Sequence, residues 1–175
     1  KTKWIKDEAE RQKMYNFIAK KIKEGRQVYV VSPLIEESET LNVKSAQETF
    51  EEYSGIFPDR RIGLIHGKQN YKEKQEVMSK FKKHELDILV STTVIEVGVN
   101  VPNASIMVIR DAQRFGLSSL HQLRGRVGRG QYQSYCFLES ETDNELSARR
   151  LEVMEKTTDG FKIAEEDLKL RNSGE

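Results

Sequence analysis

Residues 61–90 read RIGLIHGKQNYKEKQEVMSKFKKHELDILV and predict a strand, a helix and a second strand in succession. Arg61–Ile65 and Asp87–Val90 are short and mostly apolar, which is typical of buried strands. Between them, the apolar residues of Lys72–Lys82 recur at helical spacing. Two strands joined through a helix run parallel in one sheet, so this stretch predicts an α/β fold.

The same alternation extends in both directions along the chain. Further strands are predicted at Val28–Val31, Ser105–Ile109 and Ser134–Leu138, and further helices at Asp7–Glu24, Ser45–Tyr53 and Leu117–Val127. We therefore predict a parallel sheet with helices on both faces. After residue 142 the strand pattern stops, and two helical stretches, Asn144–Lys156 and Ile163–Leu170, predict a helical hairpin. The predicted domains are residues 1–141 for the sheet lobe and 142–175 for the hairpin.

Length and composition exclude several classes of protein. With 175 residues, 37% hydrophobic and 33% charged, the chain suits one globular core with an appendage. No apolar run reaches the length of a membrane span and no secretory signal is present, so we expect a cytoplasmic protein without a membrane partner. The single cysteine, Cys136, excludes an internal disulfide and is expected to be buried. His66, His84 and His121 lack metal-ligand spacing, so no metal site is expected.

Residues 112–138 contain no Asp or Glu but carry Arg114, Arg124, Arg126 and Arg129. A stretch with this charge is expected to attract phosphate. If residues 118–129 are helical, a turn of 100° per residue places the polar residues Gln122, Gly125, Arg126 and Arg129 on one face. The apolar residues Leu120, Leu123 and Val127 then lie on the opposite face. The alternative is a surface helix whose arginines have no role in binding.

Two strings imitate ATPase motifs without having their context. Asp7-Glu8-Ala9-Glu10 resembles an acidic box that holds magnesium, but it opens a helix instead of following a strand. Gly63 to Gln69 lacks a spacer residue and the final Ser or Thr of a phosphate-binding loop. Without either element the chain has no evident means of holding ATP and Mg²⁺ alone, and we expect the isolated chain to be inactive.

The pattern Gln122-x-x-Gly125-Arg126-x-Gly-Arg129 resembles motif VI of superfamily 2 helicases. That resemblance implies a RecA-like fold of the P-loop NTPase type, in which these arginines contact ATP held by another lobe. By this resemblance Arg129 is the arginine finger and Arg126 contacts the γ-phosphate. Gln122 couples the nucleotide site to the rest of the lobe. Gly125, which has no side chain, lets a phosphate approach closely. Guanidinium groups suit this role because they stay charged and donate in a fixed fork.

Residues 91–102 resemble motif V of the same helicases, which completes motifs IV to VI on this chain. By this resemblance Thr92 and Thr93 contact the DNA backbone, Gly98 lies by the nucleotide and Asn100 contacts it. The family usually has Asp at position 100, and the Asn amide oxygen can still accept a hydrogen bond. His66 and Gly67 resemble a second DNA-backbone segment. The alternatives are a strand-end turn for the threonines and a plain strand-to-helix turn for His66 and Gly67.

Residues 31–39 and 114–123 resemble the RecG family of ATP-dependent DNA helicases, which act on branched DNA in recombination and repair. The Mfd family shares most of this pattern, but Pro33–Glu37 and His121 favour RecG. Residues 159–171 resemble the translocation motif of both families, which implies that Glu165 and Arg171 couple lobe closure to movement on DNA. Arg110 and Asn172-Ser173 depart from the usual pattern, and a hairpin that serves only for packing is the alternative.

The resemblance also implies cofactors and partners. ATP and Mg²⁺ would lie between this lobe and an N-terminal RecA-like lobe, and branched double-stranded DNA would be held together with a wedge domain of the same full-length chain. The expected setting is the bacterial cytoplasm. Two rival interpretations remain: the corresponding lobe of an Mfd protein, and a non-catalytic module that binds nucleic acid.

Overall fold

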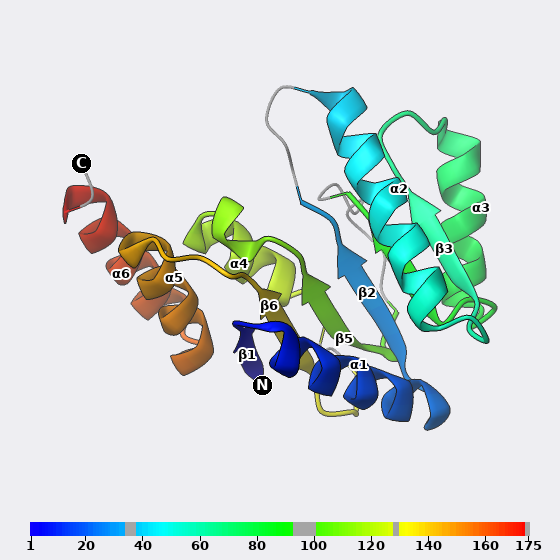
Figure 1. Cartoon of the computed structure of the whole chain (residues 1–175), viewed down its shortest axis with the longest axis horizontal. Coiled ribbons are helices and arrows are strands. Elements are labelled where there is room, and N and C mark those ends of the chain that lie inside the picture. The colour runs from blue at the N-terminus through cyan, green and yellow to red at the C-terminus, as the bar shows by residue number, and fades with distance from the viewer. Residues whose placement is uncertain (34–37, 93–100, 128–129, 174–175) are drawn as a thin grey trace.

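The computed structural model describes residues 1–33, 38–92, 101–127 and 130–173 (Figure 1). Within these residues six strands form one sheet in the order β1-β6-β5-β2-β4-β3, and every neighbouring pair is parallel. The strands are β1 (Thr2–Ile5), β2 (Gln27–Val31), β3 (Ile62–Ile65), β4 (Ile88–Ser91), β5 (Ala104–Ile109) and β6 (Tyr135–Glu139). The predicted parallel α/β sheet is confirmed.

Helices cover both faces of this sheet because successive strand residues point to opposite sides. The helices are α1 (Glu8–Lys23), α2 (Glu39–Ile56), α3 (Tyr71–Lys82), α4 (Leu117–Arg124), α5 (Glu145–Lys156) and α6 (Gly160–Ser173), with a short 3-10 turn η1 (Ala112–Arg114). Val28 and Val30 of β2 share one core with α1 and α2. Tyr29 and Val31 share the other core with α3, α4 and the two last helices.

Local sequence explains where the helices begin. Asp7 caps α1 by accepting a hydrogen bond from the Glu10 amide at 2.9 Å, so the acidic string at this position is a helix start. Ser38 and Asn144 cap α2 and α5 in the same way. Asn70 and Glu73 form a reciprocal capping box at α3.

The helical hairpin predicted after residue 142 is present as α5 and α6. It lies at the β1–β6 end of the sheet, away from α2 and α3 (Figure 1). Its buried residues Leu151, Met154, Ile163 and Leu170 belong to the same core cluster as Trp4 of β1. The hairpin therefore shares a hydrophobic core with the sheet. None of the helices in the described part of the chain is long and apolar enough to span a membrane.

One strand was not predicted, and several predicted helices differ from the structure in their bounds. Strand β1 was not predicted, because its four residues have only Trp4 and Ile5 as an apolar signal and it is stabilised by pairing with the distant β6. Helix α2 begins at Glu39 instead of Ser45 because Ser38 caps it. Helix α4 ends at Arg124, short of the predicted end, because Gly125 follows with a low helix propensity.

Candidate functional site

The carboxyl edge of the sheet brings together two of the predicted DNA contacts. His66 follows β3 and Thr92 follows the neighbouring strand β4. The Thr92 amide donates to the Ile65 carbonyl at 3.2 Å, which fixes the two strand ends side by side. His66 is half-buried, Gly67 is exposed and Thr92 is only 7% exposed. Thr93 lies outside the described residues.

The turn after β3 is held in one conformation by its own side chains. Nδ1 of His66 accepts a hydrogen bond from the Lys68 amide at 3.2 Å, and the His66 amide donates to Oε1 of Gln69 at 3.1 Å. Because Nδ1 accepts, neutral His66 carries its proton on Nε2, which is a donor suited to a phosphate oxygen. Nζ of Lys68 donates to Oγ1 of Thr40 at 3.1 Å, which places the start of α2 beside this turn.

The arginine segment, residues 124–130, follows α4. Leu120, Leu123 and Val127 are buried, as predicted, and Gln122 is exposed. Beyond Arg124 the chain does not stay α-helical: the Arg126 amide donates to Leu123 O at 3.0 Å and the Val127 amide to Arg124 O at 3.3 Å, which is the tighter three-residue spacing. The predicted single face running to Arg129 is therefore wrong as a continuous helix.

Arg126 is half-buried and lies near β2. Burial raises the pKa of Tyr29 to about 12, and the charge of Arg126 opposes that shift. At the far end of the segment, a Cβ on Gly130 would lie 2.7 Å from the Pro102 carbonyl oxygen, so only glycine fits there without a backbone shift. Gly130 therefore lies close to Pro102, just before β5. The predicted residues Gly98, Asn100 and Arg129 lie outside the described residues.

Arg124, one of the arginines of the acid-free stretch, has a structural role. Its Nη1 donates to the Met154 carbonyl of α5 at 2.7 Å and to Oγ1 of Thr2 at 3.2 Å. The side chain therefore points into the molecule and joins α4 to the hairpin and to β1. Sequence reasoning missed this role because the acceptor is a backbone carbonyl, which leaves no signature in the sequence.

The comparisons with known proteins agree with this arrangement. Residues 9–131 match the model of the helicase conserved C-terminal domain. The chain belongs to this helicase family. The matched residues include His66, Thr92 and the arginine segment, and they end before β6 and the hairpin.

Relatives of this helicase domain extend the similarity over the hairpin. The ATP-dependent DNA helicase RecG of Aquifex aeolicus (strain VF5) is 56% identical over 172 residues, covering 96% of this chain and 22% of that protein. RecG of Bacillus subtilis (strain 168) is 50% identical over 175 residues, covering 99% of this chain and 26% of that protein. The chain therefore spans about a quarter of the length of these relatives, and the predicted resemblance to RecG is confirmed.

Solved structures give the same result for the fold. The structure of RecG bound to a three-way DNA junction matches 99% of this chain and 22% of that chain, with a TM-score of 0.81 and 44% sequence identity. Domain 2 of the DEAD-box helicase Mss116p, bound to an RNA duplex, has a TM-score of 0.67 and 21% identity, covering 97% of this chain and 68% of that chain. The RecA-like fold of this helicase domain is confirmed.

The predicted coupling residues of the helicase domain lie on the exposed side of α6. Glu165 is exposed, and Nη2 of Arg171 pairs with Oδ2 of Asp167 in the same helix at 2.8 Å. His121 of α4 reaches this helix, since a Cβ on Gly160 would lie 3.2 Å from its Nε2.

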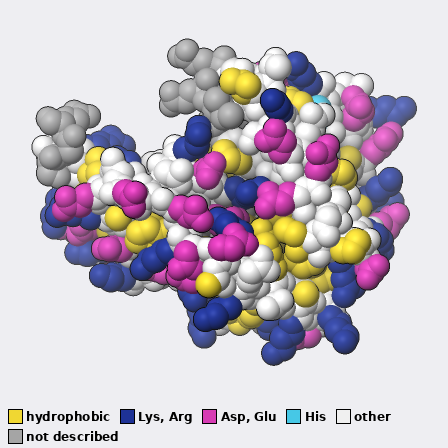
Figure 2. All heavy atoms as spheres, in the orientation of Figure 1, with side chains coloured by type: hydrophobic (Ala, Val, Ile, Leu, Met, Phe, Trp, Pro, Cys, Tyr) yellow, Lys and Arg dark blue, Asp and Glu magenta, His cyan; other side chains and the backbone are white. Residues whose placement is uncertain are grey.

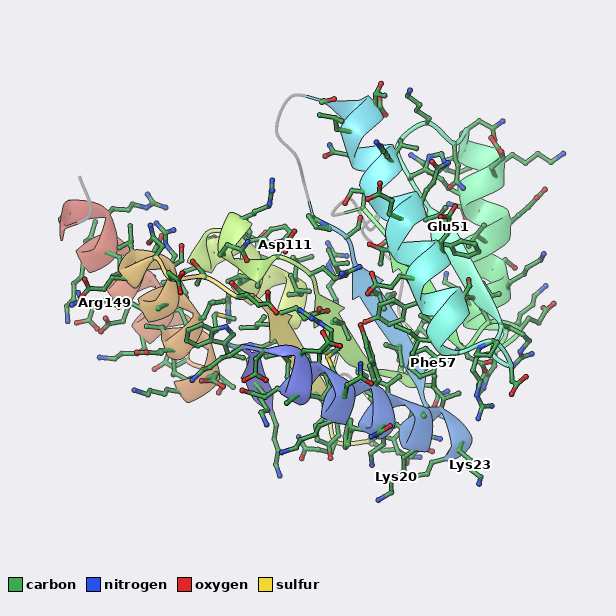
Figure 3. All side chains as sticks on the ribbon, viewed as in Figure 1. Lys20, Lys23, Glu51, Phe57, Asp111 and Arg149 are labelled. Atoms are coloured by element: carbon green, nitrogen blue, oxygen red, sulfur yellow. The ribbon has the colours of Figure 1, made fainter. Side chains whose placement is uncertain are left out.

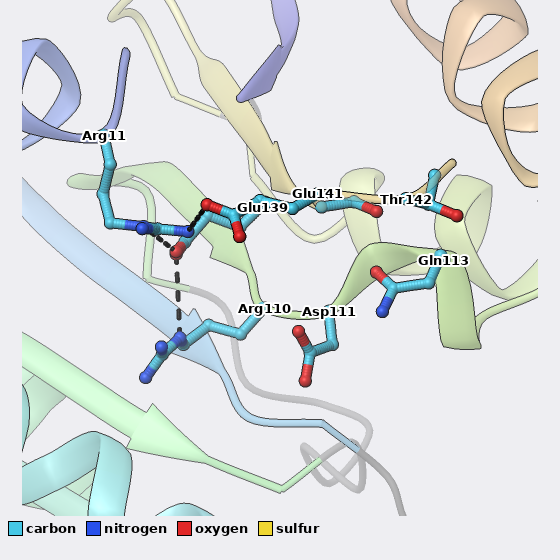
Figure 4. A pocket seen from close by; sticks show the side chains of 8 residues that line it. Arg11, Arg110, Asp111, Gln113, Glu139, Glu141 and Thr142 are labelled. Atoms are coloured by element: carbon cyan, nitrogen blue, oxygen red, sulfur yellow. Dashed lines mark hydrogen bonds and ion pairs between the residues drawn. The ribbon is translucent and has the colours of Figure 1, made fainter. Parts of the chain in front are cut away.

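A charged pocket of about 180 Å³, not predicted from the sequence, lies at the carboxyl ends of β5 and β6 (Figure 4). Glu139 is buried at 3% exposure and accepts a hydrogen bond from Nε of Arg11 at 2.6 Å. Nη1 of Arg110 donates to Oε2 of Glu52 at 2.6 Å, and its Nε lies 3.7 Å from Oε2 of Glu139. Burial raises the pKa of Glu139, although both arginines oppose the shift. Arg110, a departure from the family pattern, is thus paired with carboxylates.

The residues that the structure describes contain no group of three or more His, Cys, Asp or Glu side chains that could hold a metal ion. Cys136 is buried, and burial raises the pKa of its thiol to about 12. A thiol in that state is not nucleophilic. The described residues of the candidate site supply positive charge from Arg126 and hydrogen-bond donors at the turn that contains His66.

Proposed function

We propose that this chain is the C-terminal motor lobe of an ATP-dependent DNA helicase of the RecG type, which acts on branched DNA by fork regression and Holliday junction branch migration in recombination and repair. The observation that carries the proposal is the identity of 50% or more to RecG helicases over nearly the whole chain, hairpin included. The surface placement of Gln122 beside the arginine segment supports it.

In this proposal ATP lies between this lobe and an N-terminal RecA-like lobe. Arg126 and Arg129 stabilise the charge that develops on the phosphates, with Gln122 coupling the site to the lobe. Gly98, Asn100 and Gly125 line the nucleotide. Bound Mg²⁺ would supply positive charge to the phosphates, and we expect acidic residues of the other lobe to hold it. The described residues here contain no group of three or more His, Cys, Asp or Glu side chains that could hold a metal ion.

DNA would contact the carboxyl edge through His66, Gly67, Thr92 and Thr93. Imidazole, hydroxyl and backbone N–H groups donate hydrogen bonds to phosphate oxygens, which positions the duplex without reading its sequence. Thr92 is nearly buried, so its share of this contact depends on its small exposed surface. The duplex, the N-terminal lobe and a wedge domain of the full-length protein are the proposed partners, in a bacterial cytoplasm.

Movement would pass from the nucleotide to the DNA through the hairpin. We assign residues 1–141 to the lobe and 142–175 to the hairpin, with Glu165 and Arg171 as coupling residues. The contact that supports this route is Arg124, which lies two residues before Arg126 and holds the Met154 carbonyl of α5 at 2.7 Å. A shift of the arginine segment on ATP binding would therefore be transmitted to the hairpin through the hydrogen bond between Arg124 and the Met154 carbonyl.

The test compares DNA-stimulated ATPase activity in a protein that carries this lobe together with its N-terminal lobe. Arg126→Ala and Arg129→Ala should each lower turnover by about a thousandfold, as for other arginine fingers. Arg149→Ala, an exposed arginine on α5 that pairs within its helix, is the matched control and should leave turnover unchanged. The isolated chain should show no DNA-stimulated ATPase activity. Robust turnover by the isolated chain would overturn the proposal.

A further inference from the structure

A basic pocket of about 460 Å³ lies at the amino edge of the sheet, where the proposed function assigns no residue. It forms because β5, β2 and β4 are neighbours in the sheet, so the turns that precede these strands meet. Its ionisable lining consists of Arg26, Lys82, Lys83 and His84. No carboxylate belongs to the described lining.

The positive charge of this pocket is not neutralised within the described part of the chain, where no carboxylate pairs with Arg26, Lys82 or Lys83. The nearby Asp87 already forms an ion pair with Arg61, because its Oδ1 lies 3.0 Å from Nη2 of Arg61. The same Oδ1 lies 3.9 Å from Nε2 of His84. Lysines also complement the negative end of a helix, which accounts for their presence at the end of α3. Arg26 and His84 also follow helix ends, since the Arg26 amide donates to the Lys21 carbonyl at 2.9 Å after α1 and the His84 amide to the Phe81 carbonyl at 3.1 Å after α3. The ends of α1 and α3 therefore bring these basic side chains to the same edge of the sheet.

A buried amide network holds the three walls of the pocket together. Nε2 of Gln27, a residue 1% exposed, donates to the carbonyls of Phe81 and Leu86 at 2.7 and 2.8 Å. Nδ2 of Asn103 donates to the Gly25 carbonyl at 2.7 Å and lies 3.0 Å from Oε1 of Gln27. The basic side chains therefore start from a fixed frame, which lowers the cost of ordering them around a ligand.

Two further contacts fix the rim. The guanidinium carbon of Arg26 lies 3.3 Å from the ring centroid of Tyr132, so this arginine is stacked. His84 has φ 61°, a left-handed conformation that favours glycine or asparagine over histidine. This conformation occurs where α3 ends, directly after its C-cap residue Lys83.

We propose that this pocket binds phosphate groups of the nucleic-acid backbone, at a place separate from the His66–Thr92 edge. Arginine, lysine and histidine donors suit phosphate oxygens, and Val101 and Pro102 give an apolar wall for a sugar. Lys20 and Lys23 of α1, which precede Arg26 by a few residues in the chain, also project from the molecule (Figure 3). Figure 2 shows several Lys and Arg side chains at the lower edge of the face in view. The inference rests on the proposed function only in taking DNA as the source of phosphate.

The experiment measures binding of a fluorescent DNA duplex by the full chain between 50 and 200 mM salt, after thermal melts show that each variant is folded. Each phosphate contact contributes about 0.9 to the slope of log affinity against log salt. Lys82→Gln/Lys83→Gln should make the slope shallower by about 2. Lys13→Gln/Lys44→Gln removes the same charge from exposed positions on α1 and α2, and should leave the slope unchanged. Equal effects of the two pairs, or none, would overturn the proposal.

His84→Gly tests the strained position separately. It should raise the melting temperature, since glycine relieves the backbone, and weaken DNA binding because the donor is lost. A stabilised variant with unchanged DNA affinity counts against a phosphate contact at His84 and against the proposed pocket.

Two controls identify the source of the phosphate. In a protein that carries this lobe together with its N-terminal lobe, Lys82→Gln/Lys83→Gln should leave ATP affinity unchanged. A loss of ATP affinity with unchanged DNA binding would make the pocket a nucleotide site and overturn the proposal. His66→Ala tests the carboxyl edge alone. If it has no effect while the lysine variant loses DNA binding, the proposed DNA edge fails and the pocket stands.

Discussion

Arg124 and Arg126 are two positions apart and have opposite surroundings. Arg124 is the last residue of α4, whereas Arg126 lies in the tighter turn that follows it. Arg124 points inward to the Met154 carbonyl and to Thr2, whereas Arg126 is half-buried near Tyr29. One arginine of the segment is structural and the next is available for chemistry.

Replacing Arg124 by Ala should therefore destabilise the fold. The Met154 carbonyl would lose a hydrogen bond from a charged donor, a loss of about 1.5–3 kcal/mol in the free energy of unfolding. Urea unfolding of the chain measures this, and Arg149→Ala, an exposed arginine, should change stability by less than about 0.5 kcal/mol. Equal stability of the two variants would show that the Arg124 contacts contribute nothing.

The sequence could predict the positive charge of this stretch but not the direction of each side chain. The absence of Asp and Glu from residues 112–138 is visible by inspection. That Arg124 turns inward depends on a carbonyl 30 residues away, which becomes its partner only when the hairpin packs on α4. His66 and Thr92 lie close together because β3 and β4 are neighbours in the sheet. Local sequence patterns do not determine that strand order.

At the scale of elements, α6 has two distinct faces. Ile163 and Leu170 are 2% and 5% exposed and belong to the main core, while Phe161 is 89% exposed. The helix is thus held on the lobe by one apolar stripe. Its charged residues lie on the other side, where Arg171 pairs with Asp167.

Ile163→Ala should lower the free energy of unfolding by about 2–5 kcal/mol, because it leaves a cavity between the hairpin and the sheet. Phe161→Ala removes a larger side chain from the same helix. It should change the free energy of unfolding by less than about 0.5 kcal/mol, since the ring is already exposed to water. Chemical denaturation followed by circular dichroism compares the two. A larger loss for Phe161→Ala would mean that the exposed face of α6 is covered in solution.

Elements with strong periodicity were predictable, and those that depend on distant pairing were not. Helices α1, α3 and α5 begin within a residue or two of their predicted starts because caps and apolar spacing coincide there. Strand β1 is too short to be distinguished from a loop without knowing that β6 lies beside it. The end of α4 was misjudged because the apolar spacing continues to Val127 although the helix itself stops.

At the scale of the whole molecule, Glu139 joins elements that are far apart in sequence. Its carboxylate contacts Arg11 of α1 and lies near Arg110 after β5, which in turn binds Glu52 of α2. The cluster therefore ties β5, β6 and the helices of one face together at the carboxyl edge. Burial of the carboxylate is the dominant influence on its pKa, which is raised.

This raised pKa gives stability a defined dependence on pH. Glu139 binds its proton more tightly in the folded chain, so its contribution to the free energy of unfolding is largest below the unfolded pKa of about 4.3 and declines as pH rises through the folded pKa. The melting temperature of the unaltered chain minus that of Glu139→Gln should therefore fall between about pH 4 and pH 7. Glu51→Gln, on the exposed face of α2, controls for the loss of a surface carboxyl. A difference that grows with pH would show that the ion pairs outweigh burial.

The pairing of β1 with β6 also affects how the chain folds during synthesis. Thr2 is opposite Cys136 in the register, so β1 is synthesised before β6 and has no neighbour in the sheet until β6 has followed. Such long-range closure slows folding and leaves an unpaired backbone edge exposed during synthesis. Trp4 lies in β1 and packs in the main core, so its fluorescence would report the docking of this strand.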